Sequence, residues 1–292
     1  MKIVLFSRRQ LTHTTEELVA LRDAVLQHGF QYAVNEEFAP LLEELAAWPV
    51  PASCRYGRTL EKQPEGTVMV CYGGDGTLLE GVHRLGENEL PVLGINAGHL
   101  GFLTSAPTEG LNALFNELAE GRLKVEPRSL LSVTGNFAEE PDSRLALNEF
   151  SIQRNGAGMV SVETYVDGQM VATYHGDGVI VSTPTGSTAY ALSAGGPVVA
   201  PSCTCLVIAP LAPHNLTMRP VVVPDTSHIQ LRVRTRHAEA FATLDNRSYG
   251  ASDGAEFEIK RAEKPIFLAV PHNISFYDAL RNKMMWGVDL RG

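Results

Sequence analysis

One acidic residue lies inside a run of glycines near the start of the chain. The segment Gly73-Gly74-Asp75-Gly76-Thr77 directly follows the apolar run 67–72. Such a run, rich in β-branched residues and stopped by glycine, predicts a buried strand that ends in a turn. The glycines let backbone N–H groups approach an anionic ligand closely. A carboxylate there would repel phosphate, so we expect Asp75 to handle a proton or a metal while the backbone binds the phosphate. A tight turn whose aspartate caps the next helix is the structural alternative.

A second unusual stretch runs from residue 183 to residue 197. It follows a predicted strand at 179–182 and opens with a proline, a glycine and small hydroxyl residues. Ser187 and Thr188, at the start of a short helix, would direct hydroxyls and free N–H groups toward a polar ligand. Tyr190 would pack on, or hydrogen-bond to, a planar ring. A capped helix with a glycine stop is the alternative.

Two further polar positions interrupt apolar runs. Asn148 and Glu149 are adjacent, and Asp177 is flanked by glycines. An asparagine side chain offers both a donor and an acceptor to an adenine edge, and a glutamate accepts from a pair of hydroxyls. Taken without the other motifs, Asn148 and Glu149 are better explained by a surface turn.

The composition is that of a soluble globular protein. The chain has 292 residues, 44% of them hydrophobic and 20% charged, with a formal net charge of −9. This charge argues against sequence-independent binding of nucleic acid or of an acidic membrane surface. The opening strand is too short for a signal-peptide core, and no apolar run reaches the ~20 residues of a membrane span.

The cysteines favour a reducing, cytoplasmic location. Cys54, Cys71, Cys203 and Cys205 show no framework spacing, so we interpret them as reduced core thiols. A zinc site would need a second pair of ligands at useful spacing, which the sequence does not offer. We therefore assign no metal ligand with confidence among the protein's own residues.

The first third of the chain alternates predicted strands with predicted helices. Strands are expected at 2–7, 67–72 and 91–96, and helices after the capping box at 14–17, at 41–45, from 78 to 82 and at 108–120. This alternation predicts a parallel sheet with ligands at the carboxyl ends of its strands. The glycine loop lies at such an end.

The remainder is rich in short β-type runs separated by turn signals, and it predicts an all-β domain. Runs at 130–134, 161–166, 170–173, 179–182, 206–209, 221–223, 229–233 and 257–260 carry this prediction. We expect an α/β domain at 1–123, the all-β domain at 124–273, and a tail at 274–292 with a helix at 276–285.

Together these segments resemble bacterial NAD kinases, which phosphorylate the 2′-hydroxyl on the adenosine ribose of NAD. The glycine loop, the segments 94–96 and 98–103, the pair Asn148-Glu149 and the stretch from Asp177 to Pro197 match in order and spacing. The glycine loop is shared with diacylglycerol-type lipid kinases and, more loosely, with phosphofructokinases. The stretch at 183–190 is much more specific.

The resemblance implies a Rossmann-like α/β domain and a β-sandwich-like domain with NAD held between them, the tail returning to the first domain. It also implies ATP as phosphate donor, a divalent cation that is normally Mg²⁺, a cytoplasmic location and a homodimer or homotetramer.

The resemblance also implies the roles of individual residues. Asp75 is the expected general base, and the glycine loop (Gly73, Gly74, Gly76, Thr77) binds phosphate. The expected NAD-binding residues are Asp75, Gly76, Asn148, Glu149, His175, Asp177, Thr188, Ala189, Tyr190, Ala191, Leu192, Ser193, Ala212 and Arg247. Asp177 is expected from a neighbouring subunit, and the contact residue within 245–247 is open. His175 stands where some relatives carry arginine, so its charge at the pyrophosphate depends on pH.

Chemistry from the residues agrees with this expectation. A carboxylate beside a ribose hydroxyl can accept its proton during phosphoryl transfer. The sequence lacks both the Gly-x-x-x-x-Gly-Lys-Ser/Thr loop and the dinucleotide fingerprint of dehydrogenases. A lipid kinase that shares the glycine loop and a non-catalytic NAD-binding sensor are the alternatives.

Overall fold

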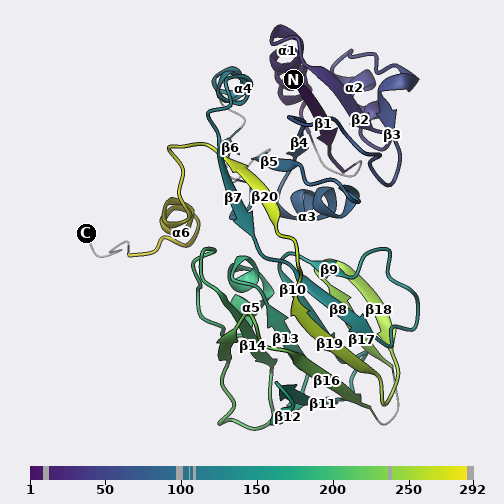
Figure 1. Ribbon diagram of the computed structural model, residues 1–292, viewed down its shortest axis with the longest axis vertical. Coiled ribbons are helices and arrows are strands. Elements are labelled where there is room, and N and C mark those ends of the chain that lie inside the picture. Colours follow the sequence, from purple (N-terminus) through teal and green to yellow (C-terminus); the bar gives the residue numbers. More distant parts are fainter. Residues whose placement is uncertain (9–12, 97–100, 105, 108–109, 236–238, 288–292) are drawn as a thin grey trace. The chain divides into compact units, whose positions relative to one another are not determined.

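The computed structural model describes residues 1–8, 13–96, 101–104, 106–107, 110–235 and 239–287. The chain divides into two compact units (Figure 1). The first unit combines Met1–Pro127 with Ile266–Gly292, and the second is Arg128–Pro265. Because the first unit uses both ends of the chain, residues from the tail can meet residues from the glycine loop.

The first unit is built on one sheet whose strand order is β3-β2-β1-β4-β5-β20-β7, with β6 beside β5. Every pair with a defined register between β1, β2, β3, β4, β5, β6 and β20 is parallel. The strands are β1 (Lys2–Phe6), β2 (Gln31–Asn35), β3 (Arg55–Tyr56), β4 (Val68–Tyr72), β5 (Pro91–Asn96), β6 (Ala106–Pro107), β7 (Lys124–Arg128) and β20 (Ile266–Val270). The central β4 is buried throughout, as expected for a parallel sheet.

Helices connect these strands and supply the other side of the core. They are α1 (Thr15–Gln27), α2 (Ala39–Leu45), α3 (Asp75–Arg84), α4 (Leu111–Ala119) and α6 (Phe276–Met284), with a short 3₁₀ turn at Ala52–Cys54. The predicted capping box is confirmed, because Thr14 and Glu17 exchange side-chain-to-backbone hydrogen bonds at the start of α1. Leu18, Leu21 and Val25 are buried on the face of α1 that the periodicity predicts.

The second unit contains two antiparallel sheets. One has the order β15-β14-β13-β10-β17-β18 and the other β12-β11-β16-β19-β8-β9. The strands are β8 (Leu131–Gly135), β9 (Leu145–Ala146), β10 (Glu149–Gln153), β11 (Val160–Val166), β12 (Gln169–Gly176), β13 (Gly178–Ser182), β14 (Cys205–Leu211), β15 (Val221–Pro224), β16 (Ile229–Arg234), β17 (Ala240–Leu244), β18 (Arg247–Ala251) and β19 (Glu256–Arg261). Inward-facing side chains of both sheets share one apolar core, so the unit is a sandwich.

The predicted fold class, a parallel-sheet α/β domain followed by a β domain, is confirmed. The boundaries differ from those expected from the sequence. The predicted division assigned 124–273 to the β domain, whereas β7 and β20 lie side by side in the first sheet. The run at 266–270 is as β-rich as any in the second unit, so composition alone does not show which sheet it joins.

Two other predictions differ in detail. Residues 108–109 of the helix predicted at 108–120 lie outside the described residues, as do residues 98–100 of the segment 98–103. The predicted helix after Pro184 is a 3₁₀ turn, Thr185–Thr188, followed by one short turn, α5 (Tyr190–Ser193). Within the described ranges, no helix is long and apolar enough to cross a membrane.

Candidate active site

Asp75 is the first helical residue of α3, and Gly74 before it is the N-cap residue. Its carboxylate does not cap α3. Instead it accepts hydrogen bonds from the loop that follows β5: from Phe102 N at 2.9 Å, Leu103 N at 3.1 Å and Thr104 N at 2.9 Å. The Thr104 hydroxyl adds a fourth, at 3.0 Å. The turn-and-cap alternative is therefore not what the structure shows.

Gly101 allows this close packing of Asp75 on the 101–104 loop. A Cβ atom at residue 101 would lie 1.9 Å from Asp75 Oδ1 and 2.4 Å from Thr104 Oγ1. Real Cβ contacts of that length do not occur, so any other residue would displace the carboxylate or the loop. The observed position of Asp75 therefore requires glycine at residue 101.

The glycine loop joins β4 to α3 at the carboxyl end of the parallel sheet. Gly73 has a φ of 149° and donates its N–H to the carbonyl of Ile95 at the end of β5. Thr77 is buried and donates its N–H to Gly74 O. The loop therefore lies where open α/β sheets bind ligands.

Two cations lie beside this loop. Arg8, which follows β1, donates to the carbonyl of Gly76 at 2.6 Å and to Glu80 at 3.0 Å. Lys283, on α6, places Nζ 3.5 Å from Asp75 Oδ2. The tail of the chain thus supplies a positive charge to the segment whose sequence suggested phosphate binding.

The second unit holds the other predicted residues, beginning with Asn148 and Glu149 at the start of β10. The carboxylate of Asp245 accepts the backbone N–H groups of Leu147, Asn148 and Glu149, at 2.9, 2.7 and 3.1 Å. Asp245 has a φ of 52°, and its own N–H donates to Glu149 O. The turn between β17 and β18 therefore fixes the conformation of the Asn148-Glu149 pair.

Several buried polar atoms of this pair and its surroundings have no hydrogen-bond partner among the residues that the structure describes. They are Asn148 Oδ1, Glu149 Oε2 and Thr185 Oγ1. Leaving such an atom unsatisfied costs on the order of 1–3 kcal/mol. Burial raises the pKa of Glu149 to about 8, with a further rise from the Asp245 charge, opposed by a hydrogen bond from the backbone of Tyr190. The three atoms form a polar set that a ligand could satisfy.

The 183–193 stretch packs directly on Asn148. Thr183 donates its backbone N–H to Asn148 O and its hydroxyl to Leu147 O. A Cβ at Gly186 would lie 2.2 Å from Asn148 O, so glycine is needed here. The predicted NAD-binding residues follow in the chain, with Ala191 fully buried: Thr188, Ala189, Tyr190, Ala191, Leu192 and Ser193.

The hydroxyls at the start of this stretch are mostly used internally. Ser187 is fully buried, donates to Val199 O and accepts from Val199 N, so it does not face a ligand as the sequence suggested. The Thr188 hydroxyl donates to Thr185 O at 3.3 Å. Tyr190 is 39% exposed, and this leaves its ring available to a ligand.

Asp177 lies close enough to Tyr190 of the same subunit for its charge to raise the tyrosine's pKa, after the larger effect of burial. Its carboxylate pairs with Arg154 at 2.5 Å. His175, on β12, is exposed, and its Nδ1 lies 2.7 Å from Ser161 Oγ. Arg154 and His175 both line a cavity of about 770 Å³.

The last two predicted contacts lie at strand ends. Ala212 has a φ of 39° just after β14, and its carbonyl would be 2.6 Å from a Cβ at Gly176. Arg247 donates to Ser143 O and Leu145 O, at 2.8 and 2.7 Å. Of residues 245–247, Asp245 therefore holds the backbone of the Asn148-Glu149 pair. Arg247 holds the backbone of the segment at 143–145, which precedes this pair in the chain.

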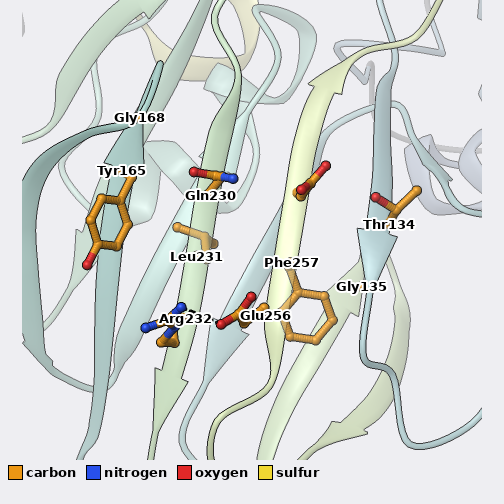
Figure 2. A pocket seen from close by; sticks show the side chains of 10 residues that line it. Thr134, Gly135, Tyr165, Gly168, Gln230, Leu231, Arg232, Glu256 and Phe257 are labelled. Atoms are coloured by element: carbon orange, nitrogen blue, oxygen red, sulfur yellow. Dashed lines mark ion pairs between the residues drawn. The ribbon is translucent and has the colours of Figure 1, made fainter.

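Another cavity, of about 600 Å³, lies on the outer face of the sheet that contains β16 and β19 (Figure 2). Its lining includes Tyr165, Phe257 and the ion pair of Arg232 with Glu256. None of the predicted site residues is among its described lining residues, so we do not connect it with the site.

The residues at Asp75 suit a metal that arrives with a ligand better than a resident one. Among the described residues there is no group of three or more His, Cys, Asp or Glu side chains that could hold a metal ion. The Asp75 carboxylate is largely occupied by N–H and O–H donors. Mg²⁺ commonly binds through substrate phosphates and its own waters, with one or two carboxylates.

Sequence reasoning missed three residues that the geometry singles out: Thr104, Asp245 as an ordering group, and Lys283. Thr104 and Asp245 were near predicted segments, but only the fold shows where their side chains point. Lys283 lies in the tail, and the topology that adds β20 to the first sheet was needed to place it near Asp75.

A parallel α/β unit with an acidic glycine loop, joined to a β-sandwich with unsatisfied buried polar atoms at Asn148, Glu149 and Thr185, indicates a nucleotide-modifying kinase without a P-loop. Comparison with known proteins agrees. The profile of the ATP-NAD kinase N-terminal domain matches residues 9–123, and that of the ATP-NAD kinase C-terminal domain matches residues 147–270. The chain therefore belongs to the NAD kinase family, and it is an enzyme.

Individual relatives span most or nearly all of the chain. An NAD kinase of Cytophaga hutchinsonii is 37% identical over 89% of both chains, and one of Porphyromonas gingivalis is 36% identical over 99% of both. A solved NAD kinase from Archaeoglobus fulgidus in complex with ATP has a TM-score of 0.73 and 27% identity, with 98% of each chain covered. Yeast NADH kinase complexed with NADH shares the fold, with a TM-score of 0.84 at 23% identity over 100% of this chain and 89% of that one.

Proposed function

We propose that this chain transfers the γ-phosphate of ATP to the 2′-hydroxyl on the adenosine ribose of NAD, giving NADP and ADP. The observation that carries the proposal is the Asp75 carboxylate, held at the glycine loop by four hydrogen bonds from residues 102–104. Family membership supports the substrate, and the orphaned polar atoms around Asn148 support an adenosine site.

Asp75 is the general base in this proposal. The ribose O–H bond breaks, its proton passes to Asp75, and the oxygen forms a bond to Pγ as the bond from Pγ to the bridging oxygen breaks. The electron pair of that bond leaves with ADP. A positioned base contributes roughly 10²–10⁴-fold. Alignment of hydroxyl and phosphoryl group contributes more. The glycine-loop N–H groups other than those of Gly73 and Thr77, which donate to Ile95 O and Gly74 O, neutralise phosphate charge.

NAD binding is assigned to Asp75, Gly76, Asn148, Glu149, His175, Asp177, Thr188–Ser193, Ala212 and Arg247. Asn148 Oδ1 is a buried acceptor without a partner among the described residues, suited to the exocyclic amine of an adenosine. The Glu149 carboxyl, protonated below its pKa of about 8, can donate to or accept from a ribose hydroxyl. Arg154 occupies Asp177 here, so a ligand that needs this carboxylate must displace or share the ion pair.

Mg²⁺ is the proposed divalent cation, bound to the ATP phosphates and neutralising their charge. A cytoplasmic location and a homodimer or homotetramer are further parts of the proposal. Four free cysteines support a reducing compartment. Sequence resemblance supports the oligomer.

A coupled assay tests the reaction. Purified protein is incubated with NAD, ATP and MgCl₂, and the product is measured with a dehydrogenase that accepts NADP but not NAD. NADH and a diacylglycerol dispersion are offered as competing acceptors. We expect NADP to form with NAD and ATP, and Mg²⁺ removal by a chelator to stop it. Binding of NAD without turnover would instead identify a sensor, and phosphorylation of the lipid alone would identify a lipid kinase.

A further inference from the structure

Lys283 places an ammonium group beside the carboxylate that the proposed reaction uses as its base. Its Nζ lies 3.5 Å from Asp75 Oδ2 and 4.9 Å from the centre of the Phe102 ring. Phe102 also donates its backbone N–H to the same oxygen, and its ring packs at 6.3 Å against that of Phe276 on α6. The position of α6 is therefore fixed by the same residue that binds Asp75.

The two oxygens of Asp75 are unequally occupied. Oδ1 accepts from Leu103 N, Thr104 N and Thr104 Oγ1 at 2.9–3.1 Å, which uses its lone pairs fully. Oδ2 accepts one N–H, from Phe102 at 2.9 Å, and has Lys283 at 3.5 Å. Charge-assisted N–H···O bonds are normally about 2.7–2.9 Å long, so this contact is loose. Oδ2 is thus the oxygen that can receive a proton, and Lys283 covers it.

A contribution to folding stability does not explain why Lys283 lies beside Asp75. Lys283 is 41% exposed and Asp75 is 27% exposed. Exposed ion pairs typically contribute about 0.2–1 kcal/mol, and a loose one contributes at the low end. The ammonium also has three donors, of which the carboxylate takes one at most.

Arg8, the other cation beside the glycine loop, already uses its guanidinium in hydrogen bonds to the protein. Its guanidinium bonds Gly76 O and Glu80 at 2.6 and 3.0 Å. Arg8 therefore reinforces the loop, whereas Lys283, within the described residues, keeps donors for a ligand.

We propose that Lys283 is a further catalytic residue, whose ammonium group binds the transferring phosphoryl group of the nucleoside triphosphate. A hydroxyl that gives its proton to Oδ2 must lie about 2.6–3.2 Å from it, and the phosphorus it attacks a further ~3–3.5 Å away. The oxygens of that phosphoryl group then lie within reach of Lys283. The lysine moves from Asp75 to the phosphate, donates hydrogen bonds to its oxygens and keeps its own proton. The bonds broken and formed are those of the proposed reaction, on which this inference rests.

The test compares three variants: Lys283→Met, which keeps length but removes charge, Lys283→Arg, which keeps charge, and Arg281→Met. Arg281 is on the same helix, is 60% exposed and pairs with Asp278, so it serves as the matched control. We expect Lys283→Met to lower kcat by on the order of 10²–10³-fold, the loss typical of one transition-state donor. The KM for NAD should stay within about threefold, Lys283→Arg should recover at least about tenfold of the loss, and Arg281→Met should match wild type.

A second measurement separates phosphate binding from support of Asp75. Inorganic tripolyphosphate is titrated into wild type, Lys283→Met and Arg281→Met by calorimetry without NAD. We expect weaker binding for Lys283→Met alone, and equal thermal midpoints for the two methionine variants. Near-wild-type kcat for Lys283→Met would overturn the inference, as would unchanged tripolyphosphate affinity. Wild-type protein that forms no NADP would instead overturn the proposed function, so the two failures are distinguishable.

Discussion

At the scale of single residues, Asp75 both holds the 102–104 loop and is the proposed base, so a mutation of Asp75 affects both. Its oxygens accept four hydrogen bonds from residues 102–104, and one of them is the proposed proton acceptor. An asparagine would turn an amide N–H against an N–H donor of the loop. The base and the loop geometry are therefore coupled.

We expect Asp75→Asn to lower kcat at least ~10²-fold and to reduce the free energy of unfolding by about 1–3 kcal/mol. Affinity for NAD should change little, because the buried polar atoms of Asn148, Glu149 and Thr185 are untouched. The coupled NADP assay, urea denaturation and NAD calorimetry measure the three effects. Thr104→Val, which removes one donor and keeps the carboxylate, should lose far less activity; equal losses in both variants would show that the loop, not the base, matters.

The raised pKa of Glu149 makes the free energy of unfolding depend on pH. Burial, with help from the charge of Asp245, raises its pKa to about 8 from 4.5. Between these two values the folded protein holds a proton that the unfolded chain has released, so stability falls as pH rises from about 4.5 to 8. Above pH 8 the penalty is constant.

Glu149→Gln mimics the protonated form and should remove this dependence. We expect the free energy of unfolding of the variant to exceed that of wild type by an amount that grows between pH 5 and pH 8, on the order of 1 kcal/mol or more. Urea titrations at pH 5, 6.5 and 8 measure the difference. A constant difference across this range would contradict the assignment of the raised pKa to Glu149.

At the scale of elements, the 101–104 loop and α3 fit together only because residue 101 has no side chain. A Cβ there would lie 1.9 Å from Asp75 Oδ1, whereas a Cβ at Gly74 would meet nothing within 4 Å. We expect Gly101→Ala to reduce kcat by more than ~10-fold and the free energy of unfolding by about 1–3 kcal/mol. Gly74→Ala should leave stability within about 1 kcal/mol. Thermal melts and the coupled assay compare the pair, and equal stability of both variants would refute the close contact.

The sequence predicted elements well where the signal is local. The capping box at Thr14, the buried strand before the glycine loop and most β-type runs are confirmed. It failed where the deciding contacts are distant. Strands β10, β17 and β18 were not predicted. β10 is buried on both faces and so has no alternation, and β18 contains the polar residues Arg247 and Ser248. Ser187 looked like a ligand contact, but its hydroxyl bonds the distant Val199.

For the candidate site, motif order located Asp75, Asn148 and Glu149, while the groups that position them came only from the fold. Thr104, Asp245 and Lys283 act through contacts with residues far away in sequence, and no local pattern specifies such a contact. Residue types thus indicated the chemistry, and topology supplied its geometry.

At the scale of the whole molecule, the first unit needs both ends of the chain. β20 lies between β5 and β7 in the first sheet, so it is an interior strand whose removal would expose two edges. α6, by contrast, follows the sheet and brings Lys283 to Asp75. The tail therefore has a structural part and a functional part, which a pair of truncations separates.

We expect a chain that ends at residue 273 to keep its sheets and bind NAD, but to lose kcat by at least as much as Lys283→Met, because Lys283 is gone and Phe102 has lost its contact with Phe276. A chain that ends at residue 265 also lacks β20, and its first unit should not fold, while the β-sandwich, whose strands lie within 128–265, stays protected. Hydrogen exchange followed by mass spectrometry reports the two units separately. Persistent protection of β4 and β5 without β20 would show that the first sheet does not depend on the end of the chain, and full activity of the longer truncation would exclude α6 from the reaction.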